Sequence, residues 1–411
     1  MRTPFRFSFF ALLSLLAVDA GLMSAQALMT GAGPGGAVNI FNTDLAVLES
    51  GDVRNDLPCT VTPQKPILGF DLRFHAGYEV SIPIKEFAGS DNMLTTVFRV
   101  INEKQPGHPV YFSQRMKVPV IQEEVVRGDA TLGGAFDVGE GSYHVDWLMR
   151  DRSERVCSFY WDAEAALVPK DRGIALDIGA GEIRHADMEQ FKEEPPVSRN
   201  PSGEPLNVKV LVNFAPQNSL SPALQPIDTS ALASILRTIS RDPQIGKFSV
   251  TAFNMQQQRV LYRQVRTDRI DFPALGQALD TLKLGTVSAT LLGQKHGETD
   301  FLADLIKNEI GDQTHPDAVI FAGPKALLDQ SVPQETLKEV GELECPVFYM
   351  NYNLNPQAVP WKDAISRTVK FFRGYEYTIS RPRDLWFAVS EMVGRIVKSR
   401  NGKHYAAVST H

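Results

Sequence analysis

The pattern of apolar residues changes at a proline-rich stretch near the middle of this 411-residue chain, and this change limits the fold more than any other feature. Residues 193–205 read EEPPVSRNPSGEP, with four prolines and few apolar side chains to bury. Because proline restricts the backbone, we expect a semi-extended linker over residues 171–205. At about 150 residues per domain, the stretches on its two sides are each long enough for a domain.

Before the linker, apolar and polar residues alternate with a period of two. Tyr78, Val80, Ile82 and Ile84 alternate with residues that include Glu79, Ser81 and Lys85, and turn signals such as Gly139–Gly141 recur between such runs. Short alternating runs without a convincing helical stretch are typical of antiparallel β-sandwiches. We therefore predict an antiparallel β-sandwich over residues 55–170.

After the linker, strand and helix patterns alternate. Val208–Phe214 is a mostly apolar run, as expected for a strand covered on both faces. Apolar residues at helical spacing follow Asp228, which we expect to cap that helix. Residues 248–265 read as a hairpin. Residues 206–400 are thus predicted to form a doubly wound α/β domain, with a mainly parallel sheet, one antiparallel edge strand and a tail at 401–411.

The first 27 residues have the features of a secretory signal peptide. Arg2 and Arg6 precede the apolar run Phe7–Val18, and the segment ends at the small-x-small site Ala25–Ala27. A retained anchor is the alternative, but the run is short of the roughly 20 residues that a span needs. We expect cleavage after residue 27, export to the periplasm or the medium, and no membrane span after cleavage. The glycine-rich start of the mature chain predicts a flexible N-terminus over residues 28–54.

Export makes the cysteines informative. Cys59 and Cys157 lie near the two ends of the expected sandwich. An oxidising compartment allows them to pair and to join the two sheet edges, and two separately buried thiols are the alternative.

The charge of the chain argues against one class of partner. There are 42 basic and 48 acidic residues, a formal net charge of −6. A mildly acidic chain lacks the basic field that phosphate backbones attract, so we expect no nucleic-acid partner.

Three segments of the second half of the chain follow one another in an order that is typical of a known protein family. They are a buried strand with a polar tip (Val210–Asn213), a Gly-x-Thr loop that opens a helix (Gly297–Leu305) and a second buried strand (Ala318–Gly323). Together they resemble the von Willebrand factor type A family over roughly residues 206–400, about half of the chain. The resemblance implies a non-enzymatic role in protein–protein recognition.

Typical members of that family hold a divalent cation at the strand tips through an Asp-x-Ser-x-Ser loop, a threonine and a second aspartate. At the corresponding positions this chain has Asn213, Ala215, Gln217, Thr299 and Ala322, so both carboxylates are missing. Affinity for Mg²⁺ or Ca²⁺ depends on charged oxygen ligands. We therefore predict that the metal site is not functional, with no metal and no cofactor.

The expected function is binding of a protein partner in the cell envelope or outside the cell. The strand-end loops 213–226, 293–299 and 323–332 are the expected contact surface, because loops on a rigid scaffold commonly carry binding. One alternative is a secreted hydrolase, in which His296 acts with Ser219 or Ser221. Another is a structural envelope module whose sandwich is the interaction unit.

Overall fold

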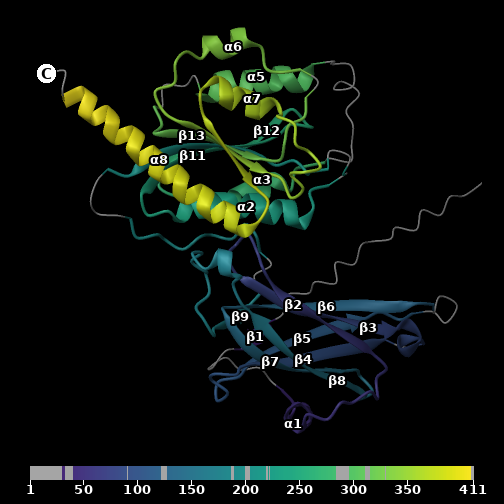
Figure 1. Cartoon of the computed structure of the whole chain (residues 1–411). Coiled ribbons are helices and arrows are strands. Elements are labelled where there is room, and N and C mark those ends of the chain that lie inside the picture. The colour runs from purple at the N-terminus through teal and green to yellow at the C-terminus, as the bar shows by residue number, and fades with distance from the viewer. Residues whose placement is uncertain are drawn as a thin grey trace, which may run out of the picture.

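A computed structural model describes residues 30–32, 40–89, 91–121, 127–186, 189–199, 204–218, 221, 223–283, 296–310, 315–328 and 330–408. The N-terminal part is rich in antiparallel strands and the C-terminal part alternates strands and helices, and the two parts lie one above the other in Figure 1. We call them the β unit (residues 30–165 with strand β9) and the α/β unit (residues 204–408). The connecting segment is residues 166–203, and strand β9 lies within it.

The β unit contains two antiparallel sheets, ordered β2–β3–β6–β9 and β1–β5–β4–β7–β8. The strands are β1 (Thr30–Ala32), β2 (Thr60–Leu68), β3 (Phe74–Pro83), β4 (Asn92–Asn102), β5 (Val110–Val118), β6 (Asp129–Val138), β7 (Gly141–Arg150), β8 (Val156–Ala165) and β9 (Ile183–His185). The short 3-10 helices η1 (Ile84–Phe87) and η3 (Pro169–Asp171) complete this part.

Both sheets contribute to one aromatic core, so they face each other as in a sandwich. Phe98 of β4 stacks on Phe112 of β5 at 4.7 Å, and Tyr78 of the other sheet meets Phe98 edge-on at 5.6 Å. Cys59, directly before β2, is disulfide-bonded to Cys157 of β8, with 6.3 Å between their Cα atoms. Because β2 and β8 are edge strands of different sheets, the predicted joining of two edges is confirmed.

The prediction of a flexible stretch over residues 28–54 is wrong where helix α1 (Asn42–Ser50) forms. Its Leu48 is buried in a small cluster on the outer face of the β4–β7–β8 sheet. Arg150 Nε donates to the buried Asp44 Oδ1 at 2.7 Å. Contacts from residues about a hundred positions away thus stabilise a nine-residue helix that would be marginal alone.

The predicted linker over residues 171–205 is also wrong in part. Strand β9 lies within it and pairs with β6, with His185 opposite Phe136. The physical reason is the placement of the prolines, which all lie beyond residue 194. Earlier residues of the segment therefore keep the N–H groups that a sheet requires.

The α/β unit has a six-stranded sheet in the order β12–β11–β10–β13–β14–β15. Its strands are β10 (Leu206–Asn213), β11 (Ile245–Asn254), β12 (Arg259–Thr267), β13 (Ala318–Gly323), β14 (Val347–Tyr352) and β15 (Tyr375–Ile379). Its helices are α2 (Pro226–Arg241), α3 (Phe272–Leu279), α5 (Gly297–Ile310), α6 (Gln334–Glu339), α7 (Ala364–Phe371) and α8 (Pro382–Val408). All strand pairs are parallel except β11–β12, the expected hairpin at one edge.

Helices cover both faces of this sheet. In one core, apolar side chains of α2, α3 and α8 pack on the sheet, and in the other core those of α5, α6 and α7 do so. In Figure 1 the second group lies above the sheet, while α2 and α3 lie below it, toward the β unit. No helix in the described part of the chain combines the length and the apolar character needed to cross a bilayer.

Two local predictions need correction. Gln225, not Asp228, is the N-cap of α2, and Asp228 stands at the third helical position of a capping box, where it accepts the N–H of Gln225. The predicted tail at 401–411 continues α8 to residue 408. The single Gly402 costs a helix only about 1 kcal/mol, and no proline follows it.

Candidate functional site

The C-terminal ends of β10 and β13 mark the point where the strand order of the α/β sheet reverses. From β10 the chain continues to β11 on one side and later returns to β13 on the other. In open α/β sheets, ligands bind at such a switch point. The structure brings two predicted site residues together here, because Val212 pairs with Ala322 and Asn213 follows directly.

This junction is neutral and tightly closed. The buried Asn213 accepts the N–H of Met255 at its Oδ1 (3.2 Å), so its side chain is fixed by the β11–β12 turn. Gly323 has φ +142°, and a Cβ atom there would lie 2.8 Å from Asn213 Cβ. Ala322 and Ala215 are buried and carry no ligand atom on their side chains. Within the described ranges, no three His, Cys, Asp or Glu side chains are grouped as metal ligands.

Gln217 lies in a second, polar group next to the junction. Its Oε1 accepts the N–H of Leu354 at 3.2 Å, while its Nε2 is buried without a hydrogen-bond partner. The hydroxyl of the buried Tyr352 lies beside the side chains of Asp228 and Gln217. Burial, followed by the nearby Asp228 carboxylate, raises the pKa of Tyr352. Burial also raises the pKa of Asp228.

Thr299 and His296 stand at the start of α5. Thr299 is buried in the first turn, and His296 is exposed and accepts the N–H of Asp300 at its carbonyl oxygen (2.9 Å). The proposed hydrolase finds no support in Ser221, whose hydroxyl donates to the carbonyl of Ala223 (2.7 Å). Ser219 and the loop residues 293–295 lie outside the described residues, so a hydrolase that uses Ser219 stays an untested hypothesis.

Two further strand-end loops are held together and carry exposed apolar side chains. Lys325, in the loop after β13, donates to the carbonyl of Trp361 (2.6 Å), in the loop after β14. Asp363 caps α7 and also accepts the N–H of Ala326 (2.6 Å). Leu327 and Trp361, which we call the strand-end patch, are 56% and 64% exposed. Sequence reasoning placed residues 323–332 on the contact surface but did not include Trp361 in it.

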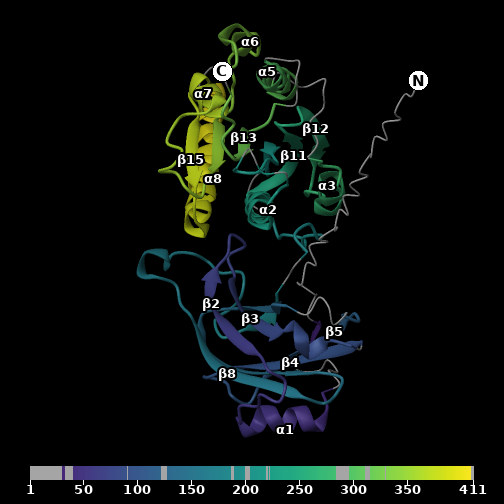
Figure 2. The same ribbon diagram turned by 90° about the vertical axis from the view of Figure 1, so that its right-hand side faces the viewer.

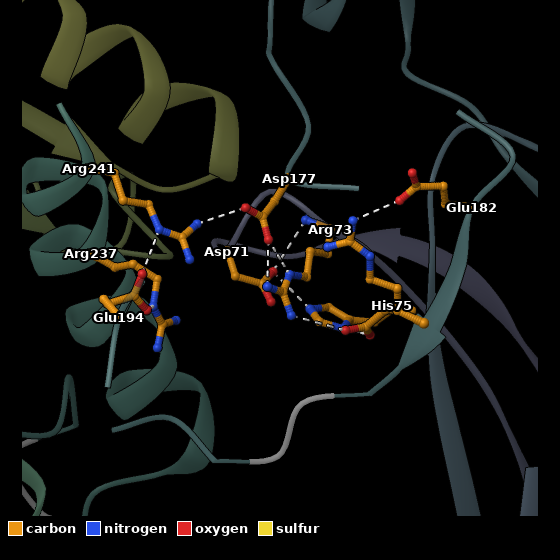
Figure 3. Close-up of polar contacts among 10 residues, drawn as sticks. Asp71, Arg73, His75, Asp177, Glu182, Glu194, Arg237 and Arg241 are labelled. Atoms are coloured by element: carbon orange, nitrogen blue, oxygen red, sulfur yellow. Dashed lines mark hydrogen bonds and ion pairs between the residues drawn. The ribbon is translucent and has the colours of Figure 1, made fainter. Parts of the chain in front are cut away.

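A separate group of charged side chains joins the two units (Figure 3). Asp177 of the connecting segment accepts Arg73 Nε at 2.7 Å and Arg241 Nη1 at 2.9 Å. Arg73 follows β2, and Arg241 ends α2. Glu194 accepts Arg237 Nε (2.5 Å) and Arg241 Nε (2.7 Å) through its two oxygens. Asp177 thus bridges an arginine of the β unit and an arginine of α2, while Glu194 binds two arginines of α2 to the connecting segment.

His75 lies at the β-unit end of this group. Its Nδ1 is 2.7 Å from Asp137 Oδ1 and its Nε2 is 3.0 Å from Asp71 Oδ1. Burial lowers the pKa of His75, but the two carboxylates outweigh it and raise the pKa to about 10. The ring is therefore charged at neutral pH and donates to both carboxylates.

Two clefts of about 260 and 230 Å³ open beside these residues, and Asp71, Arg237 and Arg241 line both. These three side chains are paired with charged neighbours. We therefore interpret the group as a joint between the units. The sequence contains no signal for it, because its members are separated by up to 170 positions and the turn at residues 69–73 resembles any solvated turn.

No protein-family model matches the chain, and no curated protein matches it. Among solved structures, the chain is similar to the PilB minor pilin from Streptococcus sanguinis, with 7% identity over 73% of this chain and 87% of that chain and a TM-score of 0.26. A glycosyl hydrolase family 2 member from Bacteroides cellulosilyticus matches with 12% identity over 79% of this chain and a TM-score of 0.19. A β-glucosidase from Listeria innocua matches with 11% identity over 27% of this chain and a TM-score of 0.17.

The chain spans 39% of the length of that glycosyl hydrolase and 16% of that of the β-glucosidase. At these TM-scores the similarities carry no argument about fold or function.

Proposed function

We propose that this chain is an exported protein that binds another protein through the strand-end patch of the α/β unit, without a metal ion and without catalysis. The observation that carries the proposal is the exposure of Trp361 and Leu327 on two loops that Lys325 and Asp363 hold together. Tryptophan dominates the energetics of many protein interfaces, and a rigid loop loses little entropy on binding.

The resemblance to the von Willebrand factor type A family remains part of the proposal. Helices on both faces of the sheet and an antiparallel strand at one edge support it. The adjacency of Asn213 and Ala322 at the strand tips, where family members hold the cation, also supports it. Neutral side chains at those two positions favour recognition by surface shape over recognition through a shared ion.

Export is proposed from two independent features. The first 27 residues have the features of a cleavable signal, and the disulfide fits an oxidising compartment. The partner is therefore sought in the envelope or in the medium.

The test is a pull-down in which the mature chain is immobilised and exposed to an envelope fraction and to culture medium. We expect Trp361→Ser with Leu327→Ser to weaken capture of the partner about 30-fold, the equivalent of a 2 kcal/mol hot spot. Val265→Ser on β12 is the matched control, because Val265 is 58% exposed but lies on the edge strand.

Capture that is equal for the wild type and the double variant would contradict the strand-end patch. It would favour a binding surface on the β unit, as in the alternative of a structural envelope module. His296→Ala, added to the series, tests whether the start of α5 belongs to the same surface.

A further inference from the structure

The loop between β2 and β3 reaches out of the β unit and completes the core of the α/β unit. Phe70 in this loop is only 8% exposed and belongs to the core formed by α2, α3 and α8. Its ring meets that of Tyr352, at the end of β14, edge-on at 6.0 Å. In Figure 2 the ribbon that follows β2 rises from the β unit toward α2 and α8.

The same loop is held in place on both sides of Phe70. Gly69 accepts the N–H of Leu72 in a tight turn, and Leu72 has φ +63°, an uncommon conformation for a residue with a side chain. The carbonyl of Leu72 accepts the N–H of Asp177, and Arg73 is ion-paired with Asp177. The backbone and side chain of Asp177 thus fasten this loop, while its second oxygen binds Arg241 of α2.

Tyr352 connects this loop to the strand-end loop on its other side. The Tyr352 hydroxyl faces Asp228 and Gln217, and Gln217 holds the N–H of Leu354. The ring of Phe70 packs edge-on against the ring of Tyr352 and is one of the contacts that hold this ring in the core. Removal of the Phe70 side chain leaves space on one side of the Tyr352 ring and takes away one of the contacts that hold the ring near Gln217.

We propose that Phe70 is a positioning residue that couples docking of the β unit to the conformation of the strand-end loops that carry Gln217 and Leu354. With Phe70 docked, Tyr352 supports Gln217 and the loop at residue 354. With Phe70 withdrawn, that support is lost. The coupling to a partner rests on the proposed function, and by linkage a partner that prefers the supported loops also tightens the joint.

Hydrogen exchange on the mature chain tests the coupling without any partner. The Leu354 and Gln225 amides, bonded to Gln217 and Asp228, report on the strand-end loop. The Ala326 and Ser366 amides are both bonded to Asp363, and Ala326 belongs to the core on the other face of the sheet. We expect Phe70→Ala to accelerate exchange at the first pair about tenfold and to leave the second pair unchanged.

Two variants separate positioning from general stability. Phe87→Ala removes a buried phenylalanine from the core of the β unit and is expected to leave all four amides unchanged. Phe70→Leu keeps an apolar side chain against Tyr352 and is expected to restore slow exchange. Equal acceleration at all four amides, or none at Leu354 and Gln225, overturns the proposal.

If Phe70→Ala does not fold, the joint itself provides the test. Asp177→Asn removes both ion pairs of the bridge and is expected to accelerate the same two amides in the same direction. Glu182→Gln is the control, because Glu182 pairs with Arg184 at the surface. Exchange that does not distinguish these two variants refutes the coupling.

Failure of the proposed function has a different signature. It leaves capture insensitive to Trp361→Ser, whereas the exchange experiment decides the coupling independently.

Discussion

Removal of the disulfide is expected to destabilise the β unit by a predictable amount. Cys59 and Cys157 are 98 positions apart, so the bond closes a long loop in the unfolded chain. The loop-entropy relation gives about 4.7 kcal/mol for a loop of this size, and removals of native disulfides typically cost 2–5 kcal/mol. The N–H of Leu57 donates to the carbonyl of Val156 beside the bond, which holds the two edges together in the folded state. We expect the double change Cys59→Ala with Cys157→Ala to cost about 4 kcal/mol.

Urea unfolding followed by tryptophan fluorescence measures this cost. Trp147 and Trp161 lie in the β unit, so substitution of Trp361 and Trp386 by phenylalanine restricts the signal to it. With a denaturant slope of about 2 kcal/mol per molar, a loss of 4 kcal/mol lowers the midpoint by about 2 M. Cys345→Ala, which changes a cysteine outside the disulfide, is the control.

A midpoint shift below about 0.3 M would show that the loop is already restricted in the unfolded chain, and would refute the entropy argument. Equal loss of stability in the α/β unit, read from Trp386 alone, would contradict a local effect.

Three further predictions concern single sites. The raised pKa of His75 means that its contribution to the free energy of unfolding is complete below about pH 6.5 and is lost as the pH rises through about 10. Because the ring is 42% exposed, we expect this loss to be about 1 kcal/mol in urea titrations of the wild type and absent in His75→Gln. Gly323→Ala is expected to cost about 2 kcal/mol or more by thermal unfolding, whereas Gly394→Ala, which meets no atom within 4 Å in α8, is expected to stabilise by about 0.5–1 kcal/mol. In the double variant Asn213→Asp with Ala322→Asp, Mg²⁺ is expected to raise the melting temperature by a few degrees, which corresponds to about 1 kcal/mol of added stability. The melting temperature of the wild type is expected not to respond to Mg²⁺. A double variant that does not respond either would count against the resemblance to the von Willebrand factor type A family.

Periodicity predicted the elements of the α/β unit well because their apolar faces are local properties of the sequence. The apolar run at residues 208–214 and the pairing of residues 248–254 with a following hairpin strand both appear in the structure. Strand β9 and helix α1 were missed for the opposite reason. Their stability comes from a sheet edge and from Arg150, which are distant in the sequence.

In the candidate site, too, local sequence patterns predicted some features, whereas features that depend on distant contacts could not be predicted. Asn213 and Ala322 could be placed together from the sequence, because parallel strands end at one sheet edge. The exposure of Trp361 could not, since a tryptophan between short strands is more often buried. The bridge at Asp177 required the packing of two units, and no local pattern encodes it.

The position of Phe70 limits how this chain can be divided in the laboratory. A fragment that begins at residue 206 would include every strand of the six-stranded sheet but would lack Phe70. It would therefore expose an apolar surface beside Tyr352 to water and to other molecules. Such a fragment is expected to aggregate unless another molecule supplies an aromatic side chain in the place of Phe70. A fragment of the second half that is to fold on its own therefore needs the loop that carries Phe70, and not only the residues that follow the prolines.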